Sequence, residues 1–412
     1  MSYEALSKLY YQDADNYEKI YASRYQGENA VQLDFVVSGN PAFYCLTPEI
    51  FGLATSIYKE EHQILKLRNE LPGIALSQFT RRCLIDEIVL TNSIEGVNST
   101  RRDIDDILDD LKGRDHKKRF QGLVQKYLML QNDSKLSLST CEDIRRIYDD
   151  LVLKEVCEED PKDRPDGELF RKDLVYVHSS TQKVIHTGLY PESEIQNAIK
   201  KAIAILQDEN QDSLIRVSVF HYFIGYIHPF YNGNGRLARF ISSYLLAREL
   251  DPLLSYRLSF PIKENINEYY KAFKICNDPK NRGDITPFIE FFLTIMHKAA
   301  EQLHQALYKR KHDLHMYEEY LESFPFVQKN QDLYPLGHAL IQAELFSEKG
   351  ISTQELLELL SISRGTLSSR LDVYRKNGLL SENQDGAKKY YRLNQKTFLQ
   401  LGGTLLAKNS QV

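Results

Sequence analysis

A run of twelve residues, from His228 to Arg239, joins two helical patterns and limits the fold more than any other part of the chain. Before this signature run, apolar residues recur every three or four positions, as on one face of a helix: Leu214, Val217, Phe220, Ile224 and Ile227. Because Pro229 disfavours helical geometry in the residue before it, His228 is expected at or just past the helix end. After Gly235 the helical spacing returns.

Gly233 and Gly235 favour a tight loop whose backbone N–H groups point inward. A glycine loop that leads into a helix with Arg236 in its first turn is suited to hold an anion such as a phosphate. Taken singly, a glycine turn is usually only a turn, and a histidine before proline is usually structural. Their combination with Arg236 and Arg239 favours a functional site, although the spacing is not that of a P-loop.

The signature run resembles that of Fic-domain proteins, His-Pro-Phe-x-(Asp/Glu)-Gly-Asn-Gly-Arg-x-x-Arg. Every position matches except the fifth, where the chain has Asn232. The resemblance covers about residues 80–295. It implies a mainly α fold, with a Fic-type helical core and a small β-hairpin flap. It also implies transfer of AMP from ATP to a Ser, Thr or Tyr hydroxyl of a target protein or of the chain itself, with release of pyrophosphate.

The resemblance gives each matching residue an expected role. His228 would be the general base, a role that suits an imidazole because it titrates near working pH. The phosphate contacts would run from α to γ along the loop and the next helix: Gly233, Asn234 and Gly235, then Arg236, then Arg239. Tyr270 is the candidate for a ring that faces adenine, and core packing by Tyr269 and Tyr270 stays open as the alternative.

Asn232 departs from the family pattern, in which an acid at this position holds the Mg²⁺ that bridges the phosphates. An amide oxygen still binds Mg²⁺ but brings no charge, so the metal affinity should fall. Asn232 is therefore expected to be a weak ligand of the Mg²⁺ or Mn²⁺ ion that accompanies ATP. Weak activity, a different transferred group and an inactive pseudoenzyme stay open.

Thr91, Glu95 and Gly96 resemble the inhibitory helix of many Fic proteins, (Ser/Thr)-x-x-x-Glu-(Gly/Asn), and place it at about residues 80–96. A carboxylate at the C-terminal end of a helix opposes the helix dipole unless a cation meets it. In the family this glutamate pairs with the last arginine of the signature, here Arg239. The pairing is chemically reasonable because a guanidinium binds a carboxylate much as it binds a phosphate. A solvated surface glutamate is the alternative.

Two short β-branched runs predict a hairpin over about residues 174–187. By resemblance it is a flap at which the target protein docks, and strand addition would supply main-chain hydrogen bonds. His178 and His186 beside it are expected to be exposed rather than metal ligands.

Four parts are expected along the chain: an N-terminal helical arm over 1–75, the Fic core over 76–300, a helical connector over 301–345, and a winged-helix-like domain over 346–400. In the last part, two short helices precede a hairpin pattern, as in a winged helix-turn-helix. Residues 351–400 carry eight Lys and Arg against five Asp and Glu, a net charge of +3. DNA binding there and a role in oligomer or target contacts both stay open.

The whole chain has a net charge of −5, so any nucleic-acid binding must be local. The five cysteines are scattered and odd in number, which suits a reducing compartment. The N-terminus has no apolar leader pattern, and no run of about 18 apolar residues occurs. These features predict a cytoplasmic protein with no membrane partner, and a homo-oligomer stays open.

The sequence therefore favours an autoinhibited protein adenylyltransferase with ATP as substrate. A deAMPylase that uses Glu95 to orient water is the enzymatic alternative. A winged-helix DNA-binding regulator, whose weakly active Fic core senses nucleotide, is the alternative from another functional class. The target protein and the modified residue are not specified by the sequence.

Overall fold

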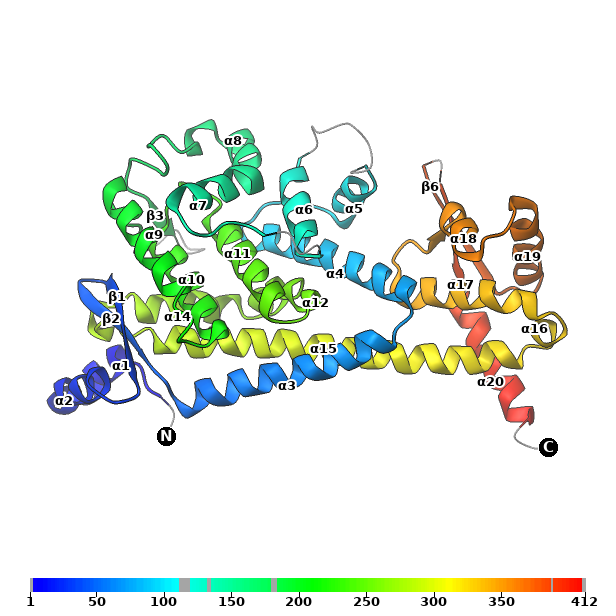
Figure 1. Ribbon diagram of the computed structural model, residues 1–412, viewed down its shortest axis with the longest axis horizontal. Coiled ribbons are helices and arrows are strands. Elements are labelled where there is room, and N and C mark those ends of the chain that lie inside the picture. The colour runs from blue at the N-terminus through cyan, green and yellow to red at the C-terminus, as the bar shows by residue number, and fades with distance from the viewer. Residues whose placement is uncertain (1–2, 111–118, 132–134, 179–183, 387, 410–412) are drawn as a thin grey trace. The chain divides into compact units, whose positions relative to one another are not determined.

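The computed structural model describes residues 3–110, 119–131, 135–178, 184–386 and 388–409 (Figure 1). The chain divides into two compact units: residues 1–62 with 84–303, and residues 63–83 with 304–412. Three helices contribute residues to both units: α3 (Pro48–Glu70), α4 (Gly73–Ile94) and α15 (Thr286–Ser323).

The first unit is mainly helical, as expected. Its other helices are α1 (Leu6–Gln12), α2 (Ala14–Tyr25), α5 (Arg101–Asp110), α6 (Gln121–Leu128), α7 (Cys141–Tyr148), α8 (Lys154–Glu159), α9 (Glu192–Leu206), α10 (Ser213–Ile227), α11 (Asn234–Glu249), α12 (Pro252–Ser255), α13 (Ser259–Glu264) and α14 (Ile266–Cys276). Single helical turns of other types are η1 (Met129–Gln131), η2 (Asp149–Leu153), η3 (Pro161–Asp163) and η4 (Pro279–Asn281). Its strands form two antiparallel pairs: β1 (Ala30–Val37) with β2 (Asn40–Cys45), and β3 (Tyr176–His178) with β4 (Val184–Thr187).

Helix α10 is the centre of the first unit. Twelve of its 15 residues are buried, because the helix is apolar on nearly every side and packs between α9 and α11 (Figure 1). The Asp212 side chain caps its start by accepting the N–H groups of Leu214 and Ile215. The helix predicted before the signature run is confirmed, and α11 begins at Asn234.

The N-terminal segment contains a two-stranded hairpin as well as helices. Ser38 and Gly39 at its tip have φ angles of 49° and 79°, and a type I′ turn requires two such positive angles. Phe43 of β2 exchanges backbone hydrogen bonds with Gly283 and Ile285, and so the segment packs within the first unit.

The hairpin predicted over 174–187 is present as β3 and β4. Residues 179–183, at its predicted turn, lie outside the described residues. The strands of the hairpin are short, so its register is set at its base, where Tyr176 pairs with Thr187.

The second unit combines helices with a small sheet. Its other helical elements are α16 (Pro325–Lys329), η5 (Gln331–Leu333), α17 (Tyr334–Phe346), α18 (Thr353–Leu360), α19 (Arg364–Lys376) and α20 (Gln395–Asn409). Strands β5 (Ile351–Ser352), β6 (Leu380–Asp385) and β7 (Lys388–Leu393) form an antiparallel sheet in the order β5-β7-β6. Ser352 caps α18 in a capping box with Glu355, and Ser363 caps α19.

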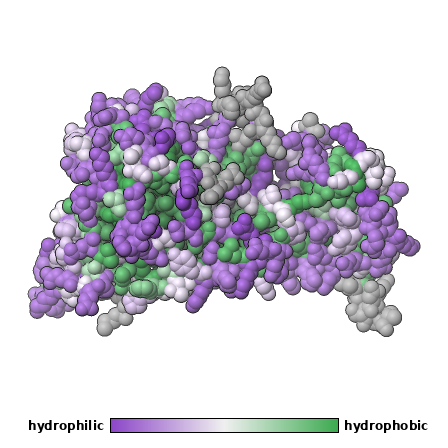
Figure 2. Space-filling view, viewed as in Figure 1, coloured by the Kyte–Doolittle hydropathy of each residue, from purple (hydrophilic) through white to green (hydrophobic). Residues whose placement is uncertain are grey.

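The surface of the molecule is mostly polar on the face that Figure 2 shows, with hydrophobic residues visible mainly in recesses between hydrophilic ones. Within the part of the chain that the structure describes, no helix is both long and apolar enough to cross a membrane.

Candidate functional site

His228 ends α10 in a left-handed backbone conformation, with φ 52° and ψ 62°. Such a conformation costs on the order of 1 kcal/mol for a residue other than glycine and must be held by its surroundings. The buried Arg171 side chain does this: its Nε donates to the His228 carbonyl oxygen at 2.9 Å, and its Nη2 donates to the Leu189 carbonyl at 2.8 Å. Arg171 thus ties the end of α10 to the base of the β3–β4 hairpin. Sequence analysis did not single it out.

The His228 ring is placed to accept a proton. Its Nδ1 faces the Gly225 carbonyl oxygen at 3.4 Å, so Nδ1 is the natural donor and Nε2 keeps its lone pair. Burial lowers the pKa of His228 to about 4, and the neighbouring His186 and Arg171 contribute in the same direction. The ring is therefore neutral at pH 7.

His186 is not exposed, contrary to expectation. It is partly buried, and its Nε2 lies 2.6 Å from the Tyr226 carbonyl oxygen. Burial lowers the pKa of His186, since the surrounding protein disfavours its charged form. The side chain of His178 lies outside the described residues.

Asn234 closes the glycine loop. Its Oδ1 accepts the Phe230 N–H at 2.9 Å, and its Nδ2 donates to the Phe230 carbonyl oxygen at 2.8 Å. Phe230 is buried and stacks on Tyr148, with ring centroids 3.6 Å apart. Both ends of the predicted phosphate-binding amide are therefore hydrogen-bonded within the loop, where they fix the backbone that leads into α11.

Glycine is needed at the two positions of the loop for different structural reasons. Gly233 has a φ of 80°, in the left-handed region that favours glycine. At Gly235 the reason is space: a Cβ atom would lie 2.1 Å from Oε1 of Glu95 and 3.0 Å from Nη1 of Arg239. The carboxylate of Glu95 thus sits directly over the first turn of α11, a position that favours an anion.

Arg239 pairs with Glu95 and is fully buried. Its Nη2 donates to Glu95 Oε1 at 2.8 Å and to the Thr91 carbonyl oxygen at 3.0 Å, and its Nε donates to Thr91 Oγ1 at 2.8 Å. Burial opposes the charge of Arg239, but Glu95, together with Tyr269 and Tyr127, outweighs it, and the pKa is raised. Helix α4 ends at Ile94, so Glu95 directly follows it, and Gly96 has the positive φ of 75° typical of a helix C-terminus.

Arg236 is also fully buried, but its guanidinium has no hydrogen-bond partner within the described ranges of the chain. None of Nε, Nη1 and Nη2 finds an acceptor among the described residues. Burial lowers the pKa of Arg236, while the charges of Glu95 and Glu155 favour its charged form. A buried cation whose five N–H groups are unsatisfied is costly, and an anion such as a phosphate would satisfy them.

A buried chain of polar groups lies against Arg239. Tyr269 lies at its guanidinium, which lowers the pKa of the phenol although burial raises it overall. The Tyr269 hydroxyl is 2.8 Å from Nε2 of His221, and Nδ1 of His221 is 2.8 Å from Ser242 Oγ. Because Ser242 Oγ donates to the Ala238 carbonyl oxygen, His221 Nδ1 is the donor to Ser242, and Tyr269 donates to Nε2. Sequence analysis missed His221, since a histidine within an apolar helix resembles any core residue.

Tyr270 is the exposed member of the tyrosine pair. Its exposed fraction is 40%, against 5% for Tyr269. Burial raises the pKa of Tyr270; the charge of Glu95 acts in the same direction and that of Arg239 in the opposite one. Its ring packs beside that of Tyr269, with ring centroids 5.5 Å apart.

Asn232 contacts an acidic side chain. Its Nδ2 donates to Asp163 Oδ2 at 3.1 Å, and its Oδ1 accepts the Gly233 N–H at 2.7 Å. The described residues contain no group of three or more His, Cys, Asp or Glu side chains that could hold a metal ion. Mg²⁺ bound with a nucleotide needs only one or two protein oxygen ligands, because phosphates and water supply the others. The donors at Asn232 and Asp163 fit such an ion.

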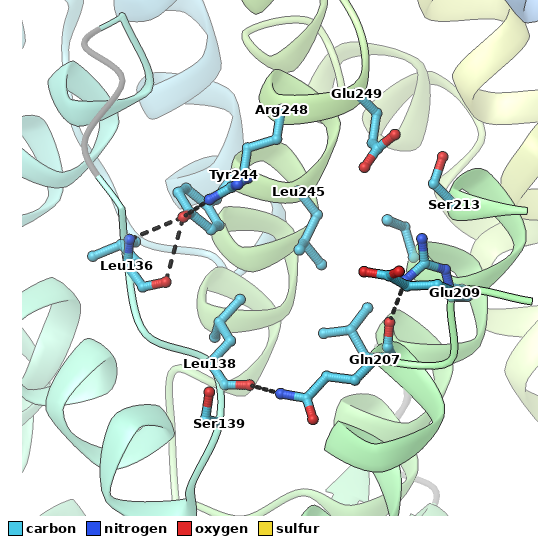
Figure 3. Close-up of a pocket in the computed structure, with 13 residues that line it drawn as sticks. Leu136, Leu138, Ser139, Gln207, Glu209, Ser213, Tyr244, Leu245, Arg248 and Glu249 are labelled. Carbon is cyan, nitrogen blue, oxygen red and sulfur yellow. Dashed lines mark hydrogen bonds between the residues drawn. The ribbon is translucent and has the colours of Figure 1, made fainter.

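A separate cavity lies at the opposite end of α10 and α11 from the signature run. It has a volume of about 350 Å³, and Figure 3 shows Tyr244, Leu245 and Arg248 of α11 on one side of it. Leu136 and Leu138 form part of its wall, held by hydrogen bonds to Tyr244 and Gln207. No residue of the signature run lines this cavity.

Residues 138–246, which include the signature run, match the family model described as the Fic/DOC family. The chain is 28% identical over 160 residues to "Protein adenylyltransferase Fic" of Drosophila yakuba, covering 37% of this chain and 29% of that protein. It is 27% identical over 237 residues to the protein of the same name in Drosophila ananassae, covering 55% and 43%. The chain thus spans less than half the length of these curated relatives.

The fold has a counterpart among solved structures. A Fic family protein from Desulfovibrio desulfuricans G20 superposes with a TM-score of 0.52 at 21% identity, over 85% of this chain and 97% of that chain. At this identity the likeness concerns the fold alone. Taken together, these comparisons show that residues 138–246 match the Fic/DOC family and that the chain is distantly related to proteins named protein adenylyltransferase.

Proposed function

We propose that this protein transfers AMP from ATP to a hydroxyl group of a target protein or of itself, and that Glu95 restrains the reaction. The observation that carries the proposal is the Arg236 guanidinium beside the glycine loop, which is buried and charged and finds no hydrogen-bond partner in the part of the chain that the structure describes. A nucleotide phosphate would satisfy it. The distant relation to protein adenylyltransferases supports AMP transfer over other phosphate chemistry.

In this proposal His228 is the general base. Its neutral ring offers Nε2 to the target hydroxyl, and the hydroxyl proton moves to that atom. The hydroxyl oxygen forms a bond to the α-phosphorus while the bond from the α-phosphorus to the bridging oxygen breaks, and pyrophosphate leaves with the electron pair. Arg236 and Arg239 would stabilise the charge on the phosphates. A divalent ion bound with ATP would neutralise further phosphate charge.

The restraint by Glu95 follows from competition between its carboxylate and a phosphate of ATP for one anion-binding position. Glu95 lies over Gly235 and pairs with Arg239, so its carboxylate stands where a phosphate at the start of α11 would lie. A carboxylate and a phosphate oxygen are alternative partners of the same guanidinium. Weak binding of the γ-phosphate, or binding in a pose that His228 cannot use, would follow.

Labelling with two forms of ATP tests the transfer step in the Glu95→Gly variant. The expected result is label on protein from ATP labelled at the α-phosphate, none from ATP labelled at the γ-phosphate, and loss of the α-label in the Glu95→Gly, His228→Ala double variant. Incorporation of the γ-label would show phosphoryl transfer and overturn the proposal. α-Label that persists without His228 would overturn the role of the base.

Removal of AMP by hydrolysis is a second candidate, favoured by the position of Glu95. Its side chain is 23% exposed, and Arg239 holds Oε1, which leaves the carboxylate placed to orient a water molecule. This activity predicts AMP release from a pre-modified target, lost in Glu95→Ala. If Glu95→Ala instead increases the modification and no release occurs in wild type, the carboxylate is a brake only.

We further propose that a target segment docks along the β3–β4 hairpin. Tyr176 and Val184 expose 50% and 46% of their surface there, and Arg171 links the base of the hairpin to His228. Alanine at both positions should lower target labelling without changing ATP affinity. A parallel loss of ATP affinity would argue against docking.

For the second unit we propose a winged-helix-like domain with DNA as a candidate ligand. Support comes from the succession α18, α19, β6 and β7, with exposed Arg364, Thr366 and Ser368 on α19. Several cations are already engaged: Arg370 with Asp332, and Arg375 and Lys389 with Glu382. Binding of labelled duplex DNA that weakens with salt and with Arg364→Ala would support this role, whereas salt-insensitive binding would contradict it.

A further inference from the structure

The Asp163 carboxylate contacts the signature run although it lies far from it in the sequence. It ends η3 and accepts a hydrogen bond from Asn232 Nδ2 at 3.1 Å. Asn232 in turn accepts the Gly233 N–H through Oδ1. The amide therefore links a carboxylate to the backbone of the glycine loop.

The glycine loop connects the Asp163 contact with Arg236. The Tyr148 hydroxyl donates to the Asn232 carbonyl oxygen at 3.1 Å. The glycine loop then leads into the first turn of α11, where the buried Arg236 guanidinium lies. The Asp163 carboxylate thus contacts the beginning of the glycine loop, and the Arg236 guanidinium follows at its end.

This arrangement favours a divalent cation when a triphosphate is bound. Phosphate oxygens on Arg236 would come near a carboxylate of the same sign, and the two anions repel at short range in a partly buried site. A divalent cation between them turns the repulsion into attraction. Carboxylate and amide oxygens are the ligands that Mg²⁺ and Mn²⁺ accept, directly or through a retained water.

We propose that Asp163 supplies the carboxylate that binds the divalent cation of the nucleotide, with Asn232 as its neutral neighbour in the site. The proposal rests on the proposed function, because it presupposes a nucleotide at Arg236. It assigns the negative charge of the metal site to a residue of η3 instead of to position 232.

Neighbouring acids of the same loop have other structural tasks. Asp160 accepts the Lys162 N–H at the start of η3, and Asp166 accepts the Lys172 N–H and the Tyr231 hydroxyl. Asp160→Asn is therefore a matched control: it removes one charge, three residues away, and an asparagine can still accept the capping hydrogen bond.

The test measures ATP binding by calorimetry with the full chain in the Glu95→Gly background, in Mg²⁺, in Mn²⁺ and in excess chelator. The ion-dependent gain is the ratio of the ATP affinity in Mg²⁺ or Mn²⁺ to the ATP affinity in chelator. For Asp163→Asn we expect this gain to fall at least about tenfold with either ion. Affinity in chelator should stay equal or rise, because a repelling charge is gone. Asp160→Asn should behave as the parent. Adding Asn232→Asp to Asp163→Asn should restore the gain, since it returns a carboxylate to the site.

Two results would overturn the inference. If Asp163→Asn and Asp160→Asn reduce the ion-dependent gain equally, the effect is one of general charge. If the gain is unchanged in Asp163→Asn, the ion is held without this carboxylate. In both cases ATP still binds, so the proposed function stands. Absence of ATP binding in the Glu95→Gly parent and in all variants would instead overturn the proposed function and this inference with it.

Discussion

The Glu95 carboxylate lies 2.8 Å from Nη2 of Arg239 and supplies one of three hydrogen bonds that this buried guanidinium makes with Glu95 and Thr91. Thr91 supplies the other two, through its side chain and its carbonyl oxygen. Arg239 therefore stays anchored to α4 when Glu95 leaves. Loss of the glutamate frees a binding position without releasing the arginine.

Replacing Arg236 by methionine should remove nucleotide binding and leave the protein at least as stable. The reason is that an unpartnered buried charge costs free energy, whereas a methionine of similar length packs without that cost. Calorimetry with ATP and thermal unfolding without ligand measure the two effects. Arg171→Met is the matched control, because Arg171 is equally buried but hydrogen-bonded to three carbonyl oxygens, and its loss should lower the melting temperature. Equal destabilisation by both would contradict the unpartnered state of Arg236.

A methyl group at Gly235 should block the anion position. Gly235 has an ordinary helical backbone, so alanine there is compatible with folding, but its Cβ atom would occupy the space of the Glu95 carboxylate. In the Glu95→Gly background, Gly235→Ala should lower ATP affinity by at least about tenfold, equivalent to the loss of a charge-assisted hydrogen bond. Gly52→Ala, at an open position on α3, should leave affinity unchanged. ATP binding that survives Gly235→Ala would place the phosphates elsewhere.

The hydroxyl group of Tyr269, and not only its aromatic ring, should help to position Arg239. Tyr269→Phe removes the donor to His221 Nε2 and the group that lies against the guanidinium, while the packing is kept. In the Glu95→Gly background we expect a higher KM for ATP with a smaller change in kcat, because the contact of Arg239 with the γ-phosphate is loosened. A merely structural role would lower stability and leave KM unchanged.

Glu87 gives a test that depends on pH. Its carboxylate is fully buried and accepts the N–H and hydroxyl of Ser259, and burial raises its pKa to about 7. The folded state therefore holds this proton more tightly than the unfolded chain. The resulting stabilisation is complete below the unfolded pKa and is lost as the pH rises through 7.

The free energy of unfolding of wild type, relative to Glu87→Gln, should thus fall between pH 5 and pH 8. The change is on the order of 3 kcal/mol for a shift of this size. Denaturant unfolding at several pH values measures it. A Glu87 difference that does not vary with pH would mean that the carboxyl group is not perturbed.

Local features of the site could be predicted because local chemistry sets them. Pro229 ends α10 before His228, and Gly233 permits the left-handed turn, so helix, loop and helix follow from the sequence. The contact of Glu95 with Arg239 was expected only through the family resemblance. Arg171, His221 and Asp163 were missed because their roles arise from tertiary contacts with residues 21 to 69 positions away, which no local pattern encodes.

The central claim is that Glu95 restrains AMP transfer. The most direct test compares the incorporation of AMP from α-labelled ATP by the wild-type full chain with that by the Glu95→Gly variant. Removing the competing carboxylate frees a charge-assisted contact, so incorporation in the variant should exceed that of wild type by about tenfold or more. Glu95→Gln should lie between them, because an amide still occupies the position but brings no charge. Equal or lower incorporation in Glu95→Gly than in wild type would contradict the account.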